Sequence, residues 1–257
     1  MAIKNMTRFT PLVALALILG SSVSAEPLSR KDLIERLSIF GEDFLVEVIE
    51  GPLIRNPLRW VSPQAGDFTY RFVEGSDNGS LIQTERRVAD TDTTHGAWER
   101  HIGERTVETF FGSEAMDIVI VQEIDHRHNF RIDIQPGVHL PANIAPGDEW
   151  EVNADLSVYR MDSDKLYKSG RLKATHTYEG AFRIRTPAGE FDTILIREDF
   201  QMHIGPLKAE DDRFLFFAKD IGLVAEIEAI RASAVFVYRE KEDSAKVLED
   251  FPGGGRT

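Results

Sequence analysis

The stretch Phe182-Arg-Ile-Arg-Thr-Pro-Ala-Gly-Glu-Phe-Asp-Thr-Ile-Leu-Ile-Arg197 decides the fold. Before its turn residues, apolar and charged side chains alternate, which is the period of a half-buried strand. Pro187 suits the first central position of a tight turn, and Gly189 suits a following residue with positive φ. The stretch therefore predicts an antiparallel hairpin, with strands over residues 182–186 and 191–196.

The same two-residue period recurs along most of the chain. Phe68, Tyr70 and Phe72 alternate with polar residues, and the segment 130–134 repeats the pattern. Antiparallel sheets with one face in water show this alternation. Comparable runs predict further strands over residues 80–90, 98–111, 116–124, 150–161, 166–178, 213–217, 223–229 and 233–239.

Helical spacing is found near the N-terminus. Leu33, Ile34 and Leu37 fall on one helical face, and Asp32 stands three residues after a Ser29 cap. The helix is expected to end near Gly41. We therefore expect a mainly β fold, either a curved antiparallel sheet or an open β-barrel, with a short N-terminal helix.

Residues 1–25 have the pattern of a secretory signal peptide. Lys4 and Arg8 form a positive region, residues 11–20 an apolar run, and Val23-Ser24-Ala25 a small-residue cleavage site. The apolar run is shorter than the roughly 20 residues that a helix needs to cross a bilayer. We expect cleavage near Ala25, a mature chain without a transmembrane span, and a periplasmic or secreted location.

The rest of the chain is expected to form an antiparallel β domain over residues 26–239. An irregular, proline-containing connection between residues 136 and 146 leaves open whether this domain has two lobes, 26–135 and 140–239. Residues 240–257 are charged and run into Pro-Gly-Gly-Gly, so a flexible tail is expected there.

Composition excludes several classes of protein. Hydrophobic residues make up 42% of the chain and include 16 Phe, which is enough for a packed core. No cysteine is present, so stability must come from burial rather than from disulfides. Removing the two positive charges of Lys4 and Arg8 changes the formal net charge from −13 to −15, spread over the chain. Such a surface repels phosphate groups, which argues against nucleic acid as a partner.

Two phrases of the C-terminal half resemble a known family. They are the stretch 182–192 quoted above and Phe216-Phe-Ala-Lys-Asp-Ile-Gly-Leu-Val224, with a Pro146-Gly147 step upstream. Together they resemble the bacterial domain-of-unknown-function family number 3108 over residues 140–239, with Lys219-Asp220 in place of that family's usual proline-glycine. The resemblance implies an exported, predominantly antiparallel β fold, and it assigns no catalytic residue.

Two clusters are candidate ligand-contacting groups. Phe214, Phe216 and Phe217 either pack in the core, as apolar strand residues mostly do, or line a ligand groove. His95, Trp98 and His101 form a polar and aromatic cluster near a predicted strand, where loop residues on a rigid β scaffold often carry function. Both interpretations of the Phe group stay open at the level of sequence.

Catalytic and metal motifs are weak. His126 and His128 lie in a predicted turn with only Asp125 as a third candidate ligand, so no metal site is expected. The pairs Glu226 with Glu228 and Glu104 with Glu108 could perform acid–base chemistry on sugars, but cross-strand ion pairing is the simpler interpretation. No serine elbow, phosphate-binding glycine loop, dinucleotide fingerprint or paired-cysteine motif occurs, so no catalytic residue or cofactor is predicted.

The function expected from these features is binding without chemistry. An exported, Phe-rich β protein suggests a periplasmic carrier of an apolar or amphipathic ligand such as a lipid, or a partner of an envelope protein. One alternative is a secreted hydrolase that uses carboxylates on envelope or sugar substrates. Another is a structural or assembly factor of the cell envelope that works through an edge strand.

Overall fold

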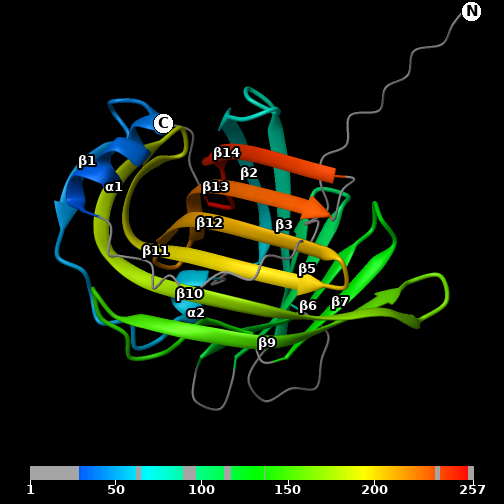
Figure 1. The fold of residues 1–257 in the computed structure, drawn as a ribbon. Coiled ribbons are helices and arrows are strands. Elements are labelled where there is room, and N and C mark those ends of the chain that lie inside the picture. Colours follow the sequence, from blue (N-terminus) through cyan, green and yellow to red (C-terminus); the bar gives the residue numbers. More distant parts are fainter. Residues whose placement is uncertain are drawn as a thin grey trace, which may run out of the picture.

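A computed structural model of the chain describes residues 29–61, 65–88, 97–112, 117–135, 137–234 and 238–253. Strands dominate these residues, and the helical parts are short, as Figure 1 shows. The prediction of a mainly β fold with a short N-terminal helix is confirmed. Within the described ranges, no helix is both long enough and apolar enough to cross a membrane.

The elements follow one another along the chain with short connections. The helical elements are α1 (Arg30–Leu37), the 3-10 helix η1 (Ser38–Phe40) and α2 (Leu58–Val61). The strands are β1 (Leu45–Ile49), β2 (Gly66–Glu74), β3 (Leu81–Val88), β4 (Ala97–Ile102), β5 (Thr106–Gly112), β6 (Ile118–Asp125), β7 (Phe130–Gln135), β8 (Val138–Leu140), β9 (Glu149–Arg160), β10 (Lys165–Thr186), β11 (Gly189–Ile204), β12 (Leu207–Ala218), β13 (Gly222–Ala234) and β14 (Tyr238–Asp250).

The sheet closes on itself. From β10 the neighbours run through β11, β12, β13 and β14 to β2, then through β3 to β7 and on to β9, which pairs with β10 again. All pairings are antiparallel, and the result is a barrel of 12 strands. Strand β1 pairs with the far half of β10, and β8 pairs with β6, so both lie off this ring. Strands from residues 26–135 and from 140–239 thus share one sheet rather than two lobes.

The hairpin predicted around Pro187 is the joint between β10 and β11. Thr186 pairs with Gly189 across a two-residue turn, and Gly189 has φ of 135°, which only glycine adopts readily. The two long strands bend away from the barrel at this end, with β1 and α1 beside them (Figure 1). The hairpin therefore builds one end of the molecule.

Residues 240–250 are not a flexible tail, so that prediction is wrong. They belong to β14, which lies between β13 and β2 and closes the barrel. Their charged side chains obscure the strand in the sequence, but Ala245, Val247 and Leu248 are at most 5% exposed. Lys246 faces a carboxylate of the neighbouring strand, so its charge is compatible with the interior.

The prediction of one long strand over residues 98–111 is also wrong. It is two strands, β4 and β5, joined by a tight turn at residues 103–105. Gly103 has φ of 56°, which lets the chain reverse there. The sequence does not mark this turn clearly, because the alternation of apolar and polar residues continues on both sides of Gly103.

The segment Ala218–Val224 joins β12 to β13 and contacts α2. Asp220 receives a bidentate hydrogen bond from the Arg59 guanidinium, and its own N–H donates to the Arg59 carbonyl at 2.6 Å. Asp220 has φ of 65°, a conformation that glycine would adopt more easily. The backbone at Asp220 therefore adopts a conformation typical of glycine. The Asp220 side chain connects α2 to the turn between β12 and β13 through its hydrogen bonds with Arg59.

Candidate functional site

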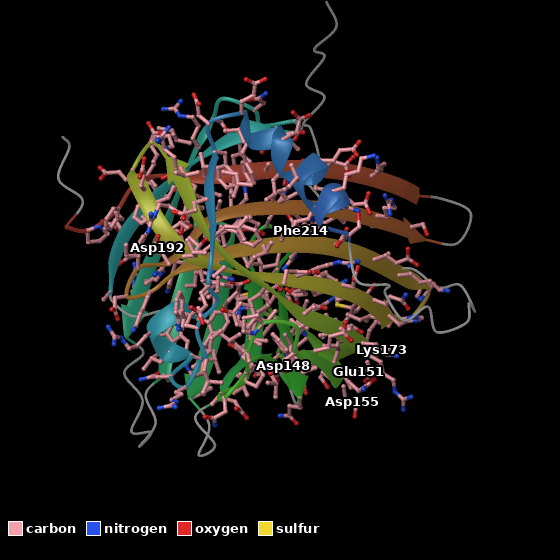
Figure 2. The ribbon with its side chains drawn as sticks, turned by 90° about the vertical axis from the view of Figure 1, so that its left-hand side faces the viewer. Asp148, Glu151, Asp155, Lys173, Asp192 and Phe214 are labelled. Carbon is pink, nitrogen blue, oxygen red and sulfur yellow. The ribbon has the colours of Figure 1, made fainter. Side chains whose placement is uncertain are left out.

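The aromatic candidates of β12 are core residues. Phe214, Phe216 and Phe217 are at most 1% exposed. The Phe216 ring packs against those of Phe40 and Phe44, with centroids 6.4 and 5.5 Å away. Phe214 lies next to α1, as Figure 2 shows, with the Arg36 guanidinium 5.1 Å from its ring centre. Their burial and ring contacts place all three in the packing role.

The histidine and tryptophan candidates do not form one site. His95 lies outside the described residues. Trp98 is 6% exposed and stacks on Phe110 with ring centroids 5.5 Å apart. His101 is three residues along the same strand, hence on its other face, where its Nε2 lies 2.8 Å from Glu99 Oε2. Trp98 is thus a core residue, and His101 contacts Glu99 on the outer wall.

The barrel interior changes character along its strands. Trp98 and Phe110 face each other across β4 and β5, and Arg100 faces Glu108 two residues further on. Since alternate strand residues share a face, an apolar layer gives way to a charged one inside the same barrel. We call the second layer the charged band; it consists of Arg100, Glu108, Glu123, Asp211, Arg213, Glu226, Glu228 and Lys246.

Most charges of this band are paired. Arg100 contacts Glu108 across β4 and β5. Lys246 lies 2.7 Å from Glu226, which is its direct partner across β14 and β13. Such pairs are needed because an unpaired charge in the interior of a protein is costly. The prediction that Glu226 and Glu228 take part in cross-strand ion pairs is confirmed.

Arg213 joins two of these strands. Its guanidinium lies 2.6 Å from Asp211 on its own strand and 2.7 Å from Glu228 on β13. Burial raises the pKa of Asp211, and Arg213 only partly offsets this effect. The guanidinium is therefore the main group that keeps these two carboxylates inside the barrel.

A cavity of about 270 Å³ lies within the charged band. Its deeper wall is formed by buried groups such as Glu108 and Glu226, which are 9% and 8% exposed. Its outer wall includes the exposed residues Arg105 and Arg127, from the turns after β4 and β6. The cavity thus reaches the end of the barrel at which these turns lie.

Glu123 stands out among the residues that line this cavity. Its carboxylate makes no hydrogen bond or ion pair with any described residue, although its direct partner across β5 and β6 is another carboxylate, Glu108. Burial, reinforced by Glu108, raises the pKa of Glu123 to about 7, against a smaller lowering by Arg213. Near neutral pH this carboxyl therefore exchanges a proton easily and can gain a positive partner.

A smaller cavity of about 100 Å³ lies deeper, on the border with the apolar layer. It shares Arg100, Glu108, Glu123 and Arg213 with the larger one. Beside it, His139, His176 and Glu198 bring their possible ligand atoms within 4.8 Å of one another. These three are the described residues that could hold a metal ion, and they are different from the pair His126 and His128 considered in the sequence.

The turn histidines have a structural role. The Asp125 carboxylate accepts a hydrogen bond from the His128 backbone N–H at 2.9 Å and lies 3.0 Å from its Nδ1. His126 is exposed. The expectation that these residues form a polar turn agrees with this geometry.

A hollow of about 900 Å³ is on the outer surface of the barrel. It is an open depression over β9, β10 and β11, bordered by Asp155 and Lys173. Figure 2 shows Glu151, Asp155 and Lys173 on this outer side. Lys173 and Glu151 lie 3.9 Å apart and are about half exposed. Water screens such charges, so this depression is a weaker candidate than the interior.

The sequence held partial signals for the interior site. Glu108, Glu226 and Glu228 were recognised as carboxylates that share strand faces. Glu123, His139 and His176 were missed, because their importance depends on which strands become neighbours. His176 gave one usable signal: it follows Leu172 and Ala174 on the inward face of β10, where a polar residue is unusual.

Comparisons with known proteins give a limited result. No family model matches the chain, and no curated protein matches it in sequence. One solved structure, a "putative exported protein with YmcC-like fold" from Bacteroides fragilis, shares 13% identity at a TM-score of 0.42. A "putative lipoprotein" from Parabacteroides distasonis shares 12% identity at a TM-score of 0.36. Each match covers 77% of this chain and 98% of the other. Neither similarity is high enough to assign a fold family or a function to this chain.

Proposed function

We propose that this protein is an exported β-barrel binding protein that holds a small, positively charged ligand in the charged band. The observation that carries the proposal is the Glu123 carboxyl, which has no partner among the described residues and faces a cavity of about 270 Å³. The neighbouring charges are already paired with each other. A cation in the cavity would supply a partner for Glu123.

The size of the cavity indicates a small ligand. Its volume of about 270 Å³ lies just below the range of about 300 to 1,000 Å³ in which drug-sized molecules bind. A ligand with an ammonium group and a few further polar atoms fits both this volume and the lining.

An apolar or amphipathic ligand is less well supported inside the barrel. The apolar layer is filled by its own side chains: Phe68 and Phe110 are at most 1% exposed. The open space is instead lined by ion pairs. A bound acyl chain would displace the water around these charges and would offer them no hydrogen bonds in return. The interior geometry therefore favours a polar ligand over a lipid.

The exported location rests on residues 1–25 alone. Their charge, apolar run and small-residue site have the pattern of a signal peptide. Peptide mapping of the protein recovered from the extracytoplasmic fraction would test it. A mature N-terminus at Glu26 is the expected result, and an intact N-terminus in the cytoplasmic fraction would contradict it.

Binding can be tested with simple ions. Isothermal titration calorimetry with tetramethylammonium, ethanolamine and acetate should show binding of one or both cations and no binding of acetate. Affinity should increase as pH rises through about 7, since an ionised Glu123 attracts a cation and a protonated one does not.

The variant Glu123→Gln should weaken cation binding about tenfold or more, because it keeps the shape and removes the charge. The matched control is Glu42→Gln, a change of an exposed carboxylate outside the barrel. Equal cation affinity in wild type and Glu123→Gln, or a preference for acetate, would contradict the proposal.

A second function is favoured by one specific observation. Glu123, with a pKa raised to about 7, stands directly opposite Glu108, which is ion-paired with Arg100. Glycoside hydrolysis uses a protonated and an ionised carboxyl on either side of the scissile bond, and the raised pKa of Glu123 suits the acid of such a pair. Turnover of 4-nitrophenyl glycosides that is lost in Glu123→Gln would establish this activity. Absence of turnover together with cation binding would favour the binding protein.

A further inference from the structure

Two histidines and a glutamate from three strands meet at the border of the charged band. His176 on β10 and Glu198 on β11 are direct cross-strand partners, and His139 comes from β8. Their candidate ligand atoms all lie within 4.8 Å of one another. The sheet itself thus sets the positions of two of the three groups.

The spacing of His176 and Glu198 fits a coordinated ion. The distance between His176 Nε2 and Glu198 Oε1 is 3.3 Å. Two ligands each about 2.0 to 2.2 Å from a tetrahedral Zn²⁺ are separated by about 3.3 to 3.5 Å. These two side chains therefore need little movement to share a metal ion.

The imidazoles have nitrogen atoms that nothing else uses. His139 Nε2 and His176 Nδ1 are buried and form no hydrogen bond with any described residue, and His176 as a whole is only 3% exposed. Buried polar atoms are nearly always paired, so each exception needs an explanation. A bound ion explains the free His139 nitrogen, which the described protein groups leave without a partner.

The surroundings hold both rings in place. The Trp150 ring stacks on His176 with centroids 4.9 Å apart and an angle of 6° between the planes. The His139 ring lies 5.6 Å from that of Phe110 and 6.2 Å from that of Phe217. Rings fixed in this way lose little freedom on binding an ion, which favours affinity.

The donor set suits a transition-metal ion. Two imidazole nitrogens and a carboxylate oxygen are ligands that Zn²⁺ accepts, and they bind a metal ion as neutral imidazoles and an ionised carboxylate.

We propose that His139, His176 and Glu198 bind a divalent transition-metal ion, with Zn²⁺ as the best match to two imidazoles and one carboxylate. Sites with three protein ligands keep a further position open for water or substrate. His139 and Glu198 both line the cavity of about 100 Å³, which has room for about three water molecules at about 30 Å³ each. The open position would face this cavity.

This metal site does not depend on the cation-binding function of Glu123. It uses other residues and a different ligand chemistry, so either can fail while the other holds. Metal binding should be measurable with no organic cation present.

The test is a metal titration of the full chain, purified without a polyhistidine tag and treated with chelator. Isothermal titration calorimetry with ZnCl₂ should give one site per chain. His139→Gln and Glu198→Gln should each lower the affinity on the order of 100-fold. The matched control is His101→Gln, which removes a histidine on the outer wall of the barrel and should leave the Zn²⁺ affinity unchanged.

A spectroscopic readout keeps the proposal testable if a variant folds poorly. Co²⁺ added to the wild-type protein should give the intense visible absorption of a four-coordinate site, and Zn²⁺ should remove it. Weak, non-stoichiometric Zn²⁺ binding would overturn the proposal. So would a Zn²⁺ affinity that folded His139→Gln and Glu198→Gln retain, with folding checked by circular dichroism.

Discussion

The two layers of the barrel interior use the same strands in opposite ways. Trp98 and Phe110 fill the apolar layer, whereas Arg100 and Glu108, two residues along the same strands, belong to the charged band. The first layer gains stability from the burial of large apolar side chains. The second contains buried charges, which cost stability unless they are paired, and it surrounds a cavity of about 270 Å³. This contrast supports the proposal that the charged band serves binding.

The largest effect is expected in the apolar layer. Phe110→Ala should lower the free energy of unfolding by about 3 to 5 kcal/mol, because it leaves a cavity beside Trp98 in a closely packed region. Chemical denaturation would measure this change. A loss below about 1 kcal/mol would mean that this layer is loosely packed and would remove the contrast between the layers.

Removing a central charge should be nearly as costly. Arg213→Met should lower the free energy of unfolding by about 2 to 4 kcal/mol at pH 8, because Asp211 and Glu228 lose their common partner. The loss should be smaller at pH 5, where burial already favours the protonated form of Asp211. A variant as stable as the wild type at both pH values would show that the ion pairs are not needed inside the barrel.

Neutralising Glu123 should have the opposite sign. The folded-state pKa of about 7 is above the ordinary value of 4.5. The free energy of unfolding of the wild-type protein therefore decreases as pH rises from about 4.5 to about 7. Glu123→Gln should therefore raise the free energy of unfolding by about 1 to 3 kcal/mol at pH 8 and leave it unchanged near pH 4. Thermal melts at the two pH values would detect the difference. A destabilised variant at pH 8 would instead indicate that the carboxylate is structural.

The smallest effect is expected for an ion pair on the outer wall. Lys241 and Asp243 lie 2.7 Å apart on β14, and their side chains are 60% and 48% exposed. Lys241→Met should change the free energy of unfolding by less than about 0.5 kcal/mol, since water screens the pair. A loss comparable to that of Arg213→Met would contradict the distinction between interior and surface charges.

The sequence predicted the local elements well where the alternation was clear. The hairpin at Pro187, the helix after Ser29 and the strands that became β9 and β13 follow from period and turn residues. Gly189 has the positive φ that the turn requires. These features depend on residues a few positions apart, and the sequence displays such relations directly.

The sequence did not predict how distant strands meet. The closure of the barrel rests on the pairing of β9 with β10 and of β14 with β2, and β14 was expected to be a tail. The charged band exists only after closure, since Glu108 and Glu226 come from strands more than a hundred residues apart. The alternation shows that one face is polar, and it does not show whether that face is inside.

Cation binding in the charged band depends on the ionisation of Glu123, which NMR of carboxyl carbons can follow in the wild-type protein. We predict a pKa near 7 in the free protein, and a decrease when a bound cation such as tetramethylammonium stabilises the carboxylate. The same experiment on the exposed Glu42 provides the reference. A Glu123 pKa near 4.5, or one that no added cation changes, would contradict the assignment of the charged band as a cation-binding site.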